Sequence, residues 1–273
     1  MLKPLRNFLL HPYPVRSFTQ GLVRKWKLGS YKQRFWMEAV ERPHYAHCVY
    51  HAAWLAKQLG LPRMSVLEFG VAGGNGLVNL EYHASNIEPM LGVKIDIYGF
   101  DSGAGLPEPV DYRDLPYHWQ HGFFKMDVPK LQSRLKRSKL VLGDVRETVP
   151  TFLETHKPAP IGVMMHDLDF HSSTAAALRL LEGSPEFFLP RMYCYFDDTL
   201  GTEIELFNDD IGQRLAINEF NRDHDTIKLG RPYHLLSRRV VEPWYHQIWT
   251  VHMFEHPRYQ DYISDRAVQL PLA

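Results

Sequence analysis

Four aspartates fall in two short groups, and each group directly follows an apolar run. Asp167 and Asp169 stand in MMHDLDF, and Asp197 and Asp198 stand in YCYFDD. If the two runs are neighbouring strands of one sheet, about 4.8 Å apart, the four carboxylates meet at its edge. Two unit negative charges at that separation repel by about 3 to 4 kcal/mol at an effective dielectric constant near 20. The group therefore needs a cation or a proton.

The ligand atoms of this group indicate which cation it would hold. Carboxylate oxygens with few thiols or imidazoles favour a hard cation such as Mg²⁺, Mn²⁺ or Ca²⁺. His166 and His171 lie in the same segment and keep a transition-metal site open. For each histidine singly, a packed or solvated side chain is the better interpretation.

A glycine-rich segment, SVLEFGVAGGNG, follows the first apolar run of the chain. Glycine lets the backbone approach a ligand closely at the carboxyl end of a buried strand. The spacing of Gly70, Gly73, Gly74 and Gly76 misses the G-x-G-x-x-G pattern of dinucleotide-binding proteins. With Glu68 it reads E-x-G-x-x-x-G-x-G, which resembles the first motif of class I S-adenosylmethionine (SAM) methyltransferases. A tight turn that binds no ligand is the structural alternative.

Two more strand ends carry groups suited to a nucleoside. Asp101, followed by Ser102, ends the run IYGFD, and a carboxylate there can accept hydrogen bonds from both hydroxyls of a ribose. An aspartate that only caps a turn is the alternative. Gly143 and Asp144 end the next run and are expected to border an adenine ring, and Asp144 also suits the N-cap of the following helix.

The elements that must position these residues alternate along the chain. A helical pattern over 45–59 precedes the strands and stops at Gly60 and Pro62. The predicted strands are Val66–Val71, Ile95–Asp101, Leu140–Gly143, Ile161–Asp167 and Met192–Asp197, with a terminal hairpin of Leu235–Val241 and Gln247–Phe254. Strands that alternate with helices favour parallel crossovers. We therefore expect an α/β, doubly wound and mostly parallel sheet with a C-terminal antiparallel hairpin. This arrangement resembles the seven-stranded, Rossmann-like methyltransferase fold.

Composition restricts the classes of partner. The 273 residues are 45% hydrophobic, and Lys+Arg and Asp+Glu each number 31, so no overall field attracts nucleic acid or membrane. Cys48 and Cys194 stand in apolar surroundings that predict burial and no disulfide framework, which fits a reducing cytoplasm. No apolar stretch reaches the roughly 18 residues that span a bilayer. We expect a cytoplasmic protein that binds a small molecule and no nucleic acid.

The first 44 residues differ from the rest of the chain. Eight Lys or Arg residues precede the first acid, Glu38. We interpret residues 1–44 as a basic, aromatic arm or lid and residues 45–273 as the SAM-dependent domain. The arm is either a solvated extension packed on the domain or a segment that contacts an anionic membrane surface or substrate. Assembly into a homo-oligomer stays open.

Four segments follow one another along the chain: EFGVAGGNG, GFDSGAGLPEP, DLDFHSST and FDD. With these segments, the chain resembles the macrocin O-methyltransferase family over roughly residues 65–225. That resemblance implies a SAM-dependent and metal-dependent enzyme that methylates sugar hydroxyls. It implies that Asp167, Asp197 and Asp198 hold the divalent cation, most simply Mg²⁺, and that Asp169 is the general base. It also implies that four residues face SAM: Glu68, Gly70, Gly74 and Asp101.

The sequence thus predicts metal-assisted methyl transfer from SAM to a hydroxyl of a sugar, a glycoside or a related vicinal diol. The aromatic segment 107–125 is expected to contact the acceptor or to pack on its own domain. Three alternatives remain: a catechol-type acceptor, a nicotinamide oxidoreductase on the same kind of sheet, and a non-catalytic SAM-binding module.

Overall fold

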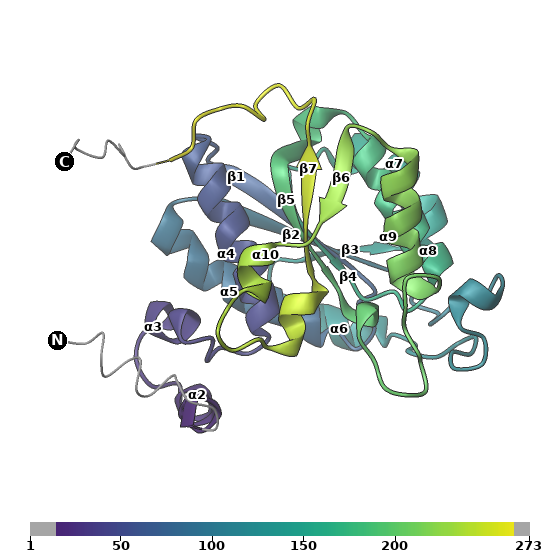
Figure 1. Ribbon diagram of the computed structural model, residues 1–273, viewed down its shortest axis with the longest axis horizontal. Helices are drawn as coiled ribbons and strands as arrows, with labels where there is room; N and C mark the ends of the chain where they lie inside the picture. The colour runs from purple at the N-terminus through teal and green to yellow at the C-terminus, as the bar shows by residue number, and fades with distance from the viewer. Residues whose placement is uncertain (1–14, 265–273) are drawn as a thin grey trace.

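Seven strands form a single sheet in the computed structural model, which describes residues 15–264 (Figure 1). Their order across the sheet is β3-β2-β1-β4-β5-β7-β6. The strands are β1 (Arg63–Phe69), β2 (Lys94–Asp101), β3 (Lys139–Leu142), β4 (Ile161–His166), β5 (Phe188–Phe196), β6 (Ile227–Gly230) and β7 (Ile248–Met253). Strands β1 to β5 pair in parallel, and β7 pairs antiparallel with both β5 and β6. The predicted fold class is confirmed.

Helices cover both faces of the sheet, as parallel crossovers require. Figure 1 shows α4 and α5 on one side and α7, α8 and α9 on the other. The longer helices are α4 (Pro43–Gln58), which precedes β1, and the crossover helices α5 (Asn75–Leu91), α7 (Val145–His156), α8 (His171–Leu178) and α9 (Gly212–Asp223). The short helices α6 (Val128–Arg134) and α10 (Tyr233–Leu236) lie in the connections, with the 3₁₀ turns η1 (Tyr112–Asp114), η2 (Arg179–Glu182), η3 (Pro185–Phe187), η4 (Asp197–Thr199) and η5 (Pro243–Gln247).

The core lies between the central strands and these helices. All six residues of β4 are buried, as a strand covered on both faces requires. The His166 ring stacks between Phe69 of β1 and Phe196 of β5, with centroid separations of 5.1 and 4.4 Å. Both predicted buried cysteines, Cys48 on α4 and Cys194 on β5, are buried and free.

The terminal hairpin differs from the prediction in one strand. Its second strand, β7, lies inside the predicted range Gln247–Phe254, but its partner is β6 at Ile227–Gly230, and residues 235–241 form no strand. The prediction for that segment was wrong because Leu235 is buried on the short helix α10. The true partner, IKLG, contains a lysine and a glycine among its four residues and therefore gave a weaker β pattern than the equally short β3.

Two helices precede the sheet, α2 (Val15–Lys25) and α3 (Tyr31–Trp36). Ser30 and Gln33 form a capping box at the start of α3. Tyr31 and Phe35 of α3 belong to the buried core, and the Tyr31 hydroxyl lies 2.8 Å from His83 Nδ1 on α5. Residues 1–14 of the predicted arm lie outside the described residues, and its boundary at residue 44 stays a prediction. Within residues 15–264, no helix has the length and apolar character needed to cross a membrane.

Candidate active site

The sheet register brings the ends of four strands level with one another. Phe69 of β1 pairs with Phe100 of β2 on one side and with His166 of β4 on the other, and His166 pairs with Phe196 of β5. The residues that come next in the chain therefore meet at one edge of the sheet: Gly70, Asp101, Asp167 and Asp197. Strand order changes direction between β1 and β4, and this is where open α/β sheets bind ligands.

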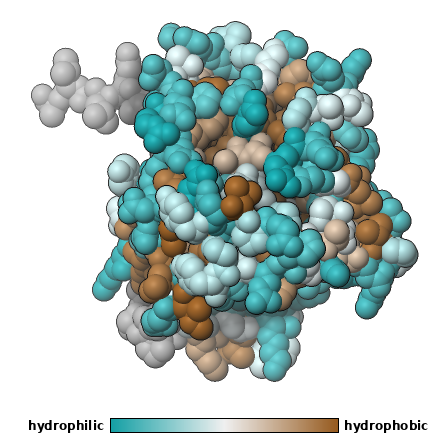
Figure 2. All heavy atoms as spheres, turned by 90° about the vertical axis from the view of Figure 1, so that its right-hand side faces the viewer, coloured by the Kyte–Doolittle hydropathy of each residue, from teal (hydrophilic) through white to brown (hydrophobic). Residues whose placement is uncertain are grey.

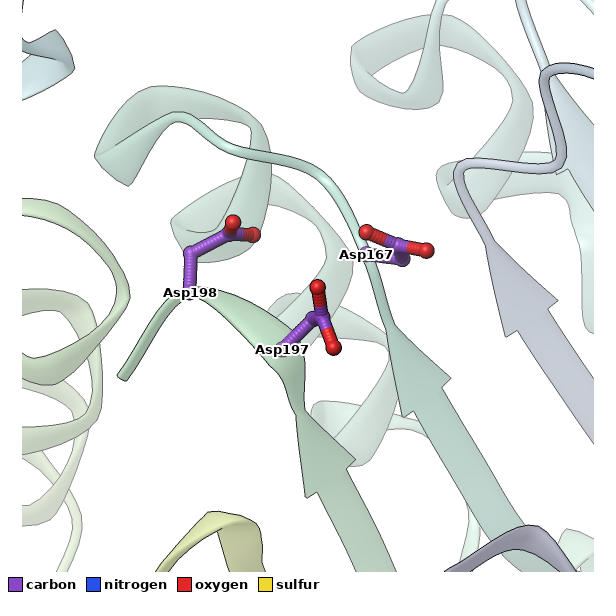
Figure 3. A group of neighbouring side chains, drawn as sticks. All are labelled: Asp167, Asp197 and Asp198. Atoms are coloured by element: carbon purple, nitrogen blue, oxygen red, sulfur yellow. The ribbon is translucent and has the colours of Figure 1, made fainter. Parts of the chain in front are cut away.

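Three of the four predicted acids form a compact group. Asp167 follows β4, while Asp197 and Asp198 follow β5, and one oxygen of each lies within 4.8 Å of the others. Figure 3 shows the three carboxylates close together at the ends of β4 and β5. Burial and the neighbouring carboxylates raise the pKa of Asp167 and of Asp198 well above the usual range. Three negative charges in this group would repel one another strongly.

Hydrogen bonds from the protein hold this group in place. The Asp169 amide N–H donates to Asp198 Oδ2 (2.9 Å), and the Asp198 amide N–H donates to Gln213 Oε1 (3.0 Å). The Tyr195 hydroxyl donates to Asp197 Oδ1, and Gln247 Nε2 donates to the Asp197 carbonyl oxygen (2.7 Å). These contacts fix the carboxylates without neutralising their charge.

The donor set fits a hard divalent cation. All three side chains offer oxygen, and the group contains no imidazole or thiol. Arg42, partly buried nearby, attracts Asp167 and partly offsets the rise of its pKa. Among residues 15–264, however, no Lys or Arg forms an ion pair with Asp167, Asp197 or Asp198. Arg42 and bound protons therefore compensate the group only in part, and a cation would offset the remaining charge.

His166 and His171, the two candidate imidazole ligands, do not point into the acid group. The His166 ring is enclosed between Phe69 and Phe196, and neither ring nitrogen has a hydrogen-bond partner. Burial lowers the pKa of His166 to about 3, so the ring is neutral. His171 Nε2 lies 2.6 Å from Glu219 Oε2. Neither imidazole belongs to the acid group, which leaves it with oxygen ligands only.

Asp169 lies beside the group but outside it. Its backbone is left-handed, with φ of 60°, and its side chain borders the same cavity as the three other aspartates. Burial first, and the charge of Asp197 second, raise the pKa of Asp169 to about 7. A carboxylate with that pKa can both accept and release a proton near neutral pH.

The glycine turn is packed against the acid-bearing strand. Gly70 has φ of 82°, and a Cβ on it would lie 1.7 Å from the Asp167 carbonyl oxygen. Gly74 has φ of 76° and is the N-cap of α5, where a Cβ would lie 2.0 Å from a Leu131 methyl group. Gly70 borders the cavity, whereas Gly74 is not among its lining residues.

Glu68 is buried behind the turn. Its Oε1 accepts a hydrogen bond from the Tyr45 hydroxyl (2.8 Å), while its Oε2 has no partner. Burial raises the pKa of Glu68 to about 7. Glu68 does not line the cavity. It could influence a bound cofactor only through its unpartnered Oε2 or by holding the glycine turn in place.

Asp101 holds the glycine turn and also faces the cavity. Asp101 Oδ2 accepts from the amides of Val71 (2.9 Å) and Ala72 (2.8 Å), and Oδ1 accepts from the amide of Gly103 (2.7 Å). An ionised carboxylate offers about four acceptor positions, so one remains on Oδ1 for a ligand hydroxyl. Asp101 can therefore accept a hydrogen bond from one ribose hydroxyl, but not from both as predicted, while it holds the turn.

The remaining predicted residues also serve their own loops. The Ser102 hydroxyl donates to the Gly105 carbonyl oxygen (2.9 Å). Asp144 is the N-cap of α7, as expected, because its side chain accepts from the Arg146 amide (2.8 Å), and it also pairs with the Arg146 guanidinium. Gly143, with φ of 138°, stands between β3 and this cap.

One cavity of about 560 Å³ connects these residues. Its floor is formed by strand-end residues that the sequence predicted: Gly70, Asp101, Ser102, Gly143, Asp144, Asp167, Asp169, Asp197 and Asp198. Its roof comes from two loops and includes Trp119, His121, Phe124, Leu200, Glu205 and Phe207. Figure 2 looks onto the side of the molecule that carries α8 and α9, where apolar surface lies between hydrophilic side chains.

Part of this site was missed by the sequence analysis. The segment 107–125 was expected near the acceptor, but the second roof loop, with Leu200, Glu205 and Phe207, was not. Tyr117 joins the two loops because its hydroxyl donates to the Glu205 carbonyl oxygen (2.8 Å). The sequence did contain a signal for this loop: acidic and aromatic residues directly follow Asp197 and Asp198, and so lie at the same sheet edge as the other candidates.

No family model and no curated protein matches this chain. Among solved structures, the calicheamicin methyltransferase CalS11 matches with a TM-score of 0.50 and 21% identity, covering 89% of this chain and 94% of CalS11. The O-methyltransferase NovP also matches at 0.50, with 14% identity, covering 77% of this chain and 79% of NovP. Apo CalS11, described as a TDP-rhamnose 3'-O-methyltransferase of calicheamicin biosynthesis, matches at 0.41 with 20% identity, covering 92% and 91% of the two chains. The two matches at 0.50 show that the chain shares the Rossmann-like fold of CalS11 and NovP.

Proposed function

We propose that this chain is a SAM-dependent O-methyltransferase that uses a divalent cation and acts on a hydroxyl of a sugar or related vicinal diol. One observation carries the proposal: three carboxylates that follow two neighbouring strands, with no Lys or Arg ion pair among residues 15–264, border one cavity with a glycine turn. A methyl donor and a cation-dependent acceptor could meet there. The membership in the macrocin O-methyltransferase family stays a proposal.

The floor residues would hold the cofactor. Gly70 and Ala72 bring backbone to the cavity wall without a bulky side chain, and Asp101 keeps one acceptor position for a ribose hydroxyl. Gly143 and Asp144 border the next part of the same wall, where the adenine is expected. Ser102 stands beside Asp101, and Glu68 supports the turn from behind.

The acid group would hold the cation through Asp167, Asp197 and Asp198. A divalent cation at such a site supplies Lewis-acid activation and a fixed orientation for a hydroxyl acceptor. Asp169, in this proposal, accepts the proton of the attacking hydroxyl on its carboxylate. Its pKa of about 7 suits this role, since a general base is most effective near the working pH.

The roof favours a ring-shaped acceptor. Trp119, Phe124 and Phe207 offer aromatic surface to the cavity, and His121 and Glu205 offer polar groups. Aromatic side chains contact the apolar faces of sugar rings, and CalS11 is described as acting on a TDP-sugar. The same aromatic lining also favours the second candidate, a catechol-type acceptor, because two adjacent phenolic oxygens would present the same pair of ligands as a diol.

The first test is binding. Isothermal titration should show saturable SAM binding in EDTA as well as in Mg²⁺, and NAD⁺ should give no saturable heat. Saturable NAD⁺ binding without SAM binding would contradict the cofactor assignment and favour the nicotinamide alternative.

The second test is turnover with a methyl-labelled donor and a panel of nucleotide sugars, free glycosides and catechols. Label should enter one acceptor class in Mg²⁺ and stop with EDTA. The Asp169→Asn variant should bind SAM normally and lose turnover, while the exposed control Asp225→Asn keeps it. Transfer that is insensitive to EDTA would remove the cation from the proposal, and transfer to catechols alone would decide for the second candidate.

A further inference from the structure

Helix α2 is attached to the protein by its polar face. Arg16 and Gln20, one turn apart, are its two buried residues. The Arg16 guanidinium pairs with Glu38 (2.6 Å) and with Glu242, and Gln20 Nε2 donates to the Met37 carbonyl oxygen (2.8 Å). An ordinary surface helix buries its apolar stripe and exposes its polar face. Helix α2 instead buries part of its polar face.

Several apolar side chains of α2 and of the segment after it consequently face solvent, although Leu22 is half-buried. Val15, Phe18 and Leu22 recur at three- and four-residue spacing, so they share one face of α2. Phe18 is 69% exposed. Directly after the helix, Trp26 is 60% and Leu28 52% exposed. Figure 1 shows α2 and α3 together at the lower left, outside the two helical layers.

Positive charge accompanies this apolar surface. From Val15 to Met37 the sequence has six Lys or Arg residues and no acid. Lys25, Lys27 and Lys32 are exposed, and none of the ion pairs within residues 15–264 uses them. Trp36 on α3 is exposed as well. We call residues 15–36 the basic arm.

We propose that the basic arm docks on an anionic lipid bilayer. Tryptophan prefers the level of the lipid headgroups, and apolar side chains flanked by lysines enter the boundary between headgroups and acyl chains. Each Lys or Arg near an anionic membrane surface adds to the attraction, which falls off within a Debye length. Alternating Lys25, Trp26, Lys27 and Leu28 place both kinds of contact in one short exposed segment.

A second copy of this chain fits the same surface less well. The common two-fold dimer places a patch against the identical patch of its partner. Here that would bring the lysines of one arm against the lysines of the other, with no acid between Val15 and Met37 to pair with them. An anionic surface removes this repulsion. The proposal does not depend on the proposed methyl transfer, because none of these residues borders the cavity.

The test measures co-sedimentation of the full chain with vesicles at about 0.1 M salt. One set of vesicles is pure phosphatidylcholine, and the other contains three parts phosphatidylglycerol to seven parts phosphatidylcholine. We expect at least tenfold stronger partitioning onto the anionic vesicles, and a steep loss of binding at about 1 M salt, where screening is nearly complete. Equal partitioning onto both kinds of vesicle, or none onto the anionic kind, would overturn the proposal.

Matched variants assign the contact to the arm. Lys25→Glu with Lys27→Glu should lower partitioning at least about tenfold, whereas Lys57→Glu with Lys94→Glu, which gives the same net charge, should not. Phe18→Ala with Trp26→Ala should also weaken binding, whereas Tyr233→Ala, at another exposed aromatic, should not. Thermal melts confirm that each variant is folded. If arm and control variants bind alike, or if the arm variants only abolish a dimer seen by sedimentation velocity, the membrane proposal is wrong.

Discussion

Neutralising one aspartate of the acid group should stabilise the protein when no divalent cation is present. Asp167→Asn is the cleanest change, because it keeps the size of the side chain and removes its charge. The usual outcome of a substitution at a partly buried site is a loss of stability. The opposite sign is expected here because the charges of the group oppose one another.

The magnitude follows from the geometry of the group. Its oxygens lie within 4.8 Å of one another, and two unit charges at that separation repel by about 3.5 kcal/mol at an effective dielectric constant near 20. Asp167 takes part in two of the three pairs, so full ionisation at that separation would cost it about 7 kcal/mol. Its raised pKa means that a bound proton already relieves part of this repulsion. At pH 8 without cation, we expect Asp167→Asn to raise the free energy of unfolding by about 1 to 3 kcal/mol.

The same variant should lose the response to Mg²⁺. A cation at about one hundred times its dissociation constant stabilises the folded state by about 2.7 kcal/mol. For a domain of this size each kcal/mol shifts the melting temperature by about 2 to 4 °C. The wild-type protein should therefore melt about 5 to 10 °C higher in saturating Mg²⁺ than in EDTA, and Asp167→Asn should melt at nearly the same temperature in both.

Thermal melts at pH 8 in EDTA and in a Mg²⁺ series measure both effects. Asp225→Asn is the matched control, since it removes a carboxylate whose side chain is fully exposed, and it should keep the wild-type Mg²⁺ response. Lower stability of Asp167→Asn in EDTA, together with an unchanged Mg²⁺ shift, would refute the reasoning. It would mean that Asp167 is a structural residue and that the cation binds elsewhere.

Three further outcomes are expected. Asp101→Ala should weaken SAM binding by about 1.5 to 3 kcal/mol in isothermal titration, the scale of charge-assisted hydrogen bonds, and unchanged affinity would remove Asp101 from the cofactor site. Gly70→Ala should destabilise the protein by about 3 kcal/mol or more in urea unfolding because its Cβ would overlap the Asp167 carbonyl oxygen, whereas Gly73→Ala, with no atom within 4 Å of its Cβ, should stay within about 1 kcal/mol. In EDTA, the folded protein keeps a proton on Asp169 up to about pH 7, while the unfolded chain releases it near pH 4. Wild-type stability should consequently fall relative to Asp169→Asn as pH rises through that window, by at most about 4 kcal/mol, and a difference that is independent of pH would contradict the raised pKa.

The strands that the sequence identified were those with long or uninterrupted apolar runs, including the short run LVL of β3. Runs such as MMH before Asp167 and YCYF before Asp197 are covered by helices on both faces, so burial alone shaped their composition. The strand β6 (IKLG) escaped because a lysine and a glycine interrupt its apolar pattern, and its pairing with β7 depends on contacts distant in sequence. The predicted strand at 235–241 failed because the burial of Leu235 serves a helical turn instead.

The residues of the site also differ in whether local sequence could predict them. Residues at the ends of parallel strands could be predicted to meet, because the register of a parallel sheet brings consecutive strand ends to one edge. The roof could not, since nothing local links Tyr117 to Glu205, which lie 88 positions apart. The supports of Asp197 were missed for the same reason: Gln247 reaches its carbonyl oxygen from the far end of the chain.

The glycines of the turn are weaker evidence for a ligand site than the aspartates of the acid group. A Cβ on Gly70 would overlap the Asp167 carbonyl oxygen, so the packing of the backbone itself requires this glycine. A Cβ on Gly76 would lie 1.8 Å from Glu68 Oε1, the end of a side chain that would have to shift. Gly70 would therefore be needed in a scaffold that binds no cofactor as well. No such requirement holds for the charge of Asp167, because asparagine would fill the same space without the repulsion. A scaffold without a cation would gain stability by replacing it, so the acids, which are compensated only in part, distinguish a binding site from a turn better than the glycines do.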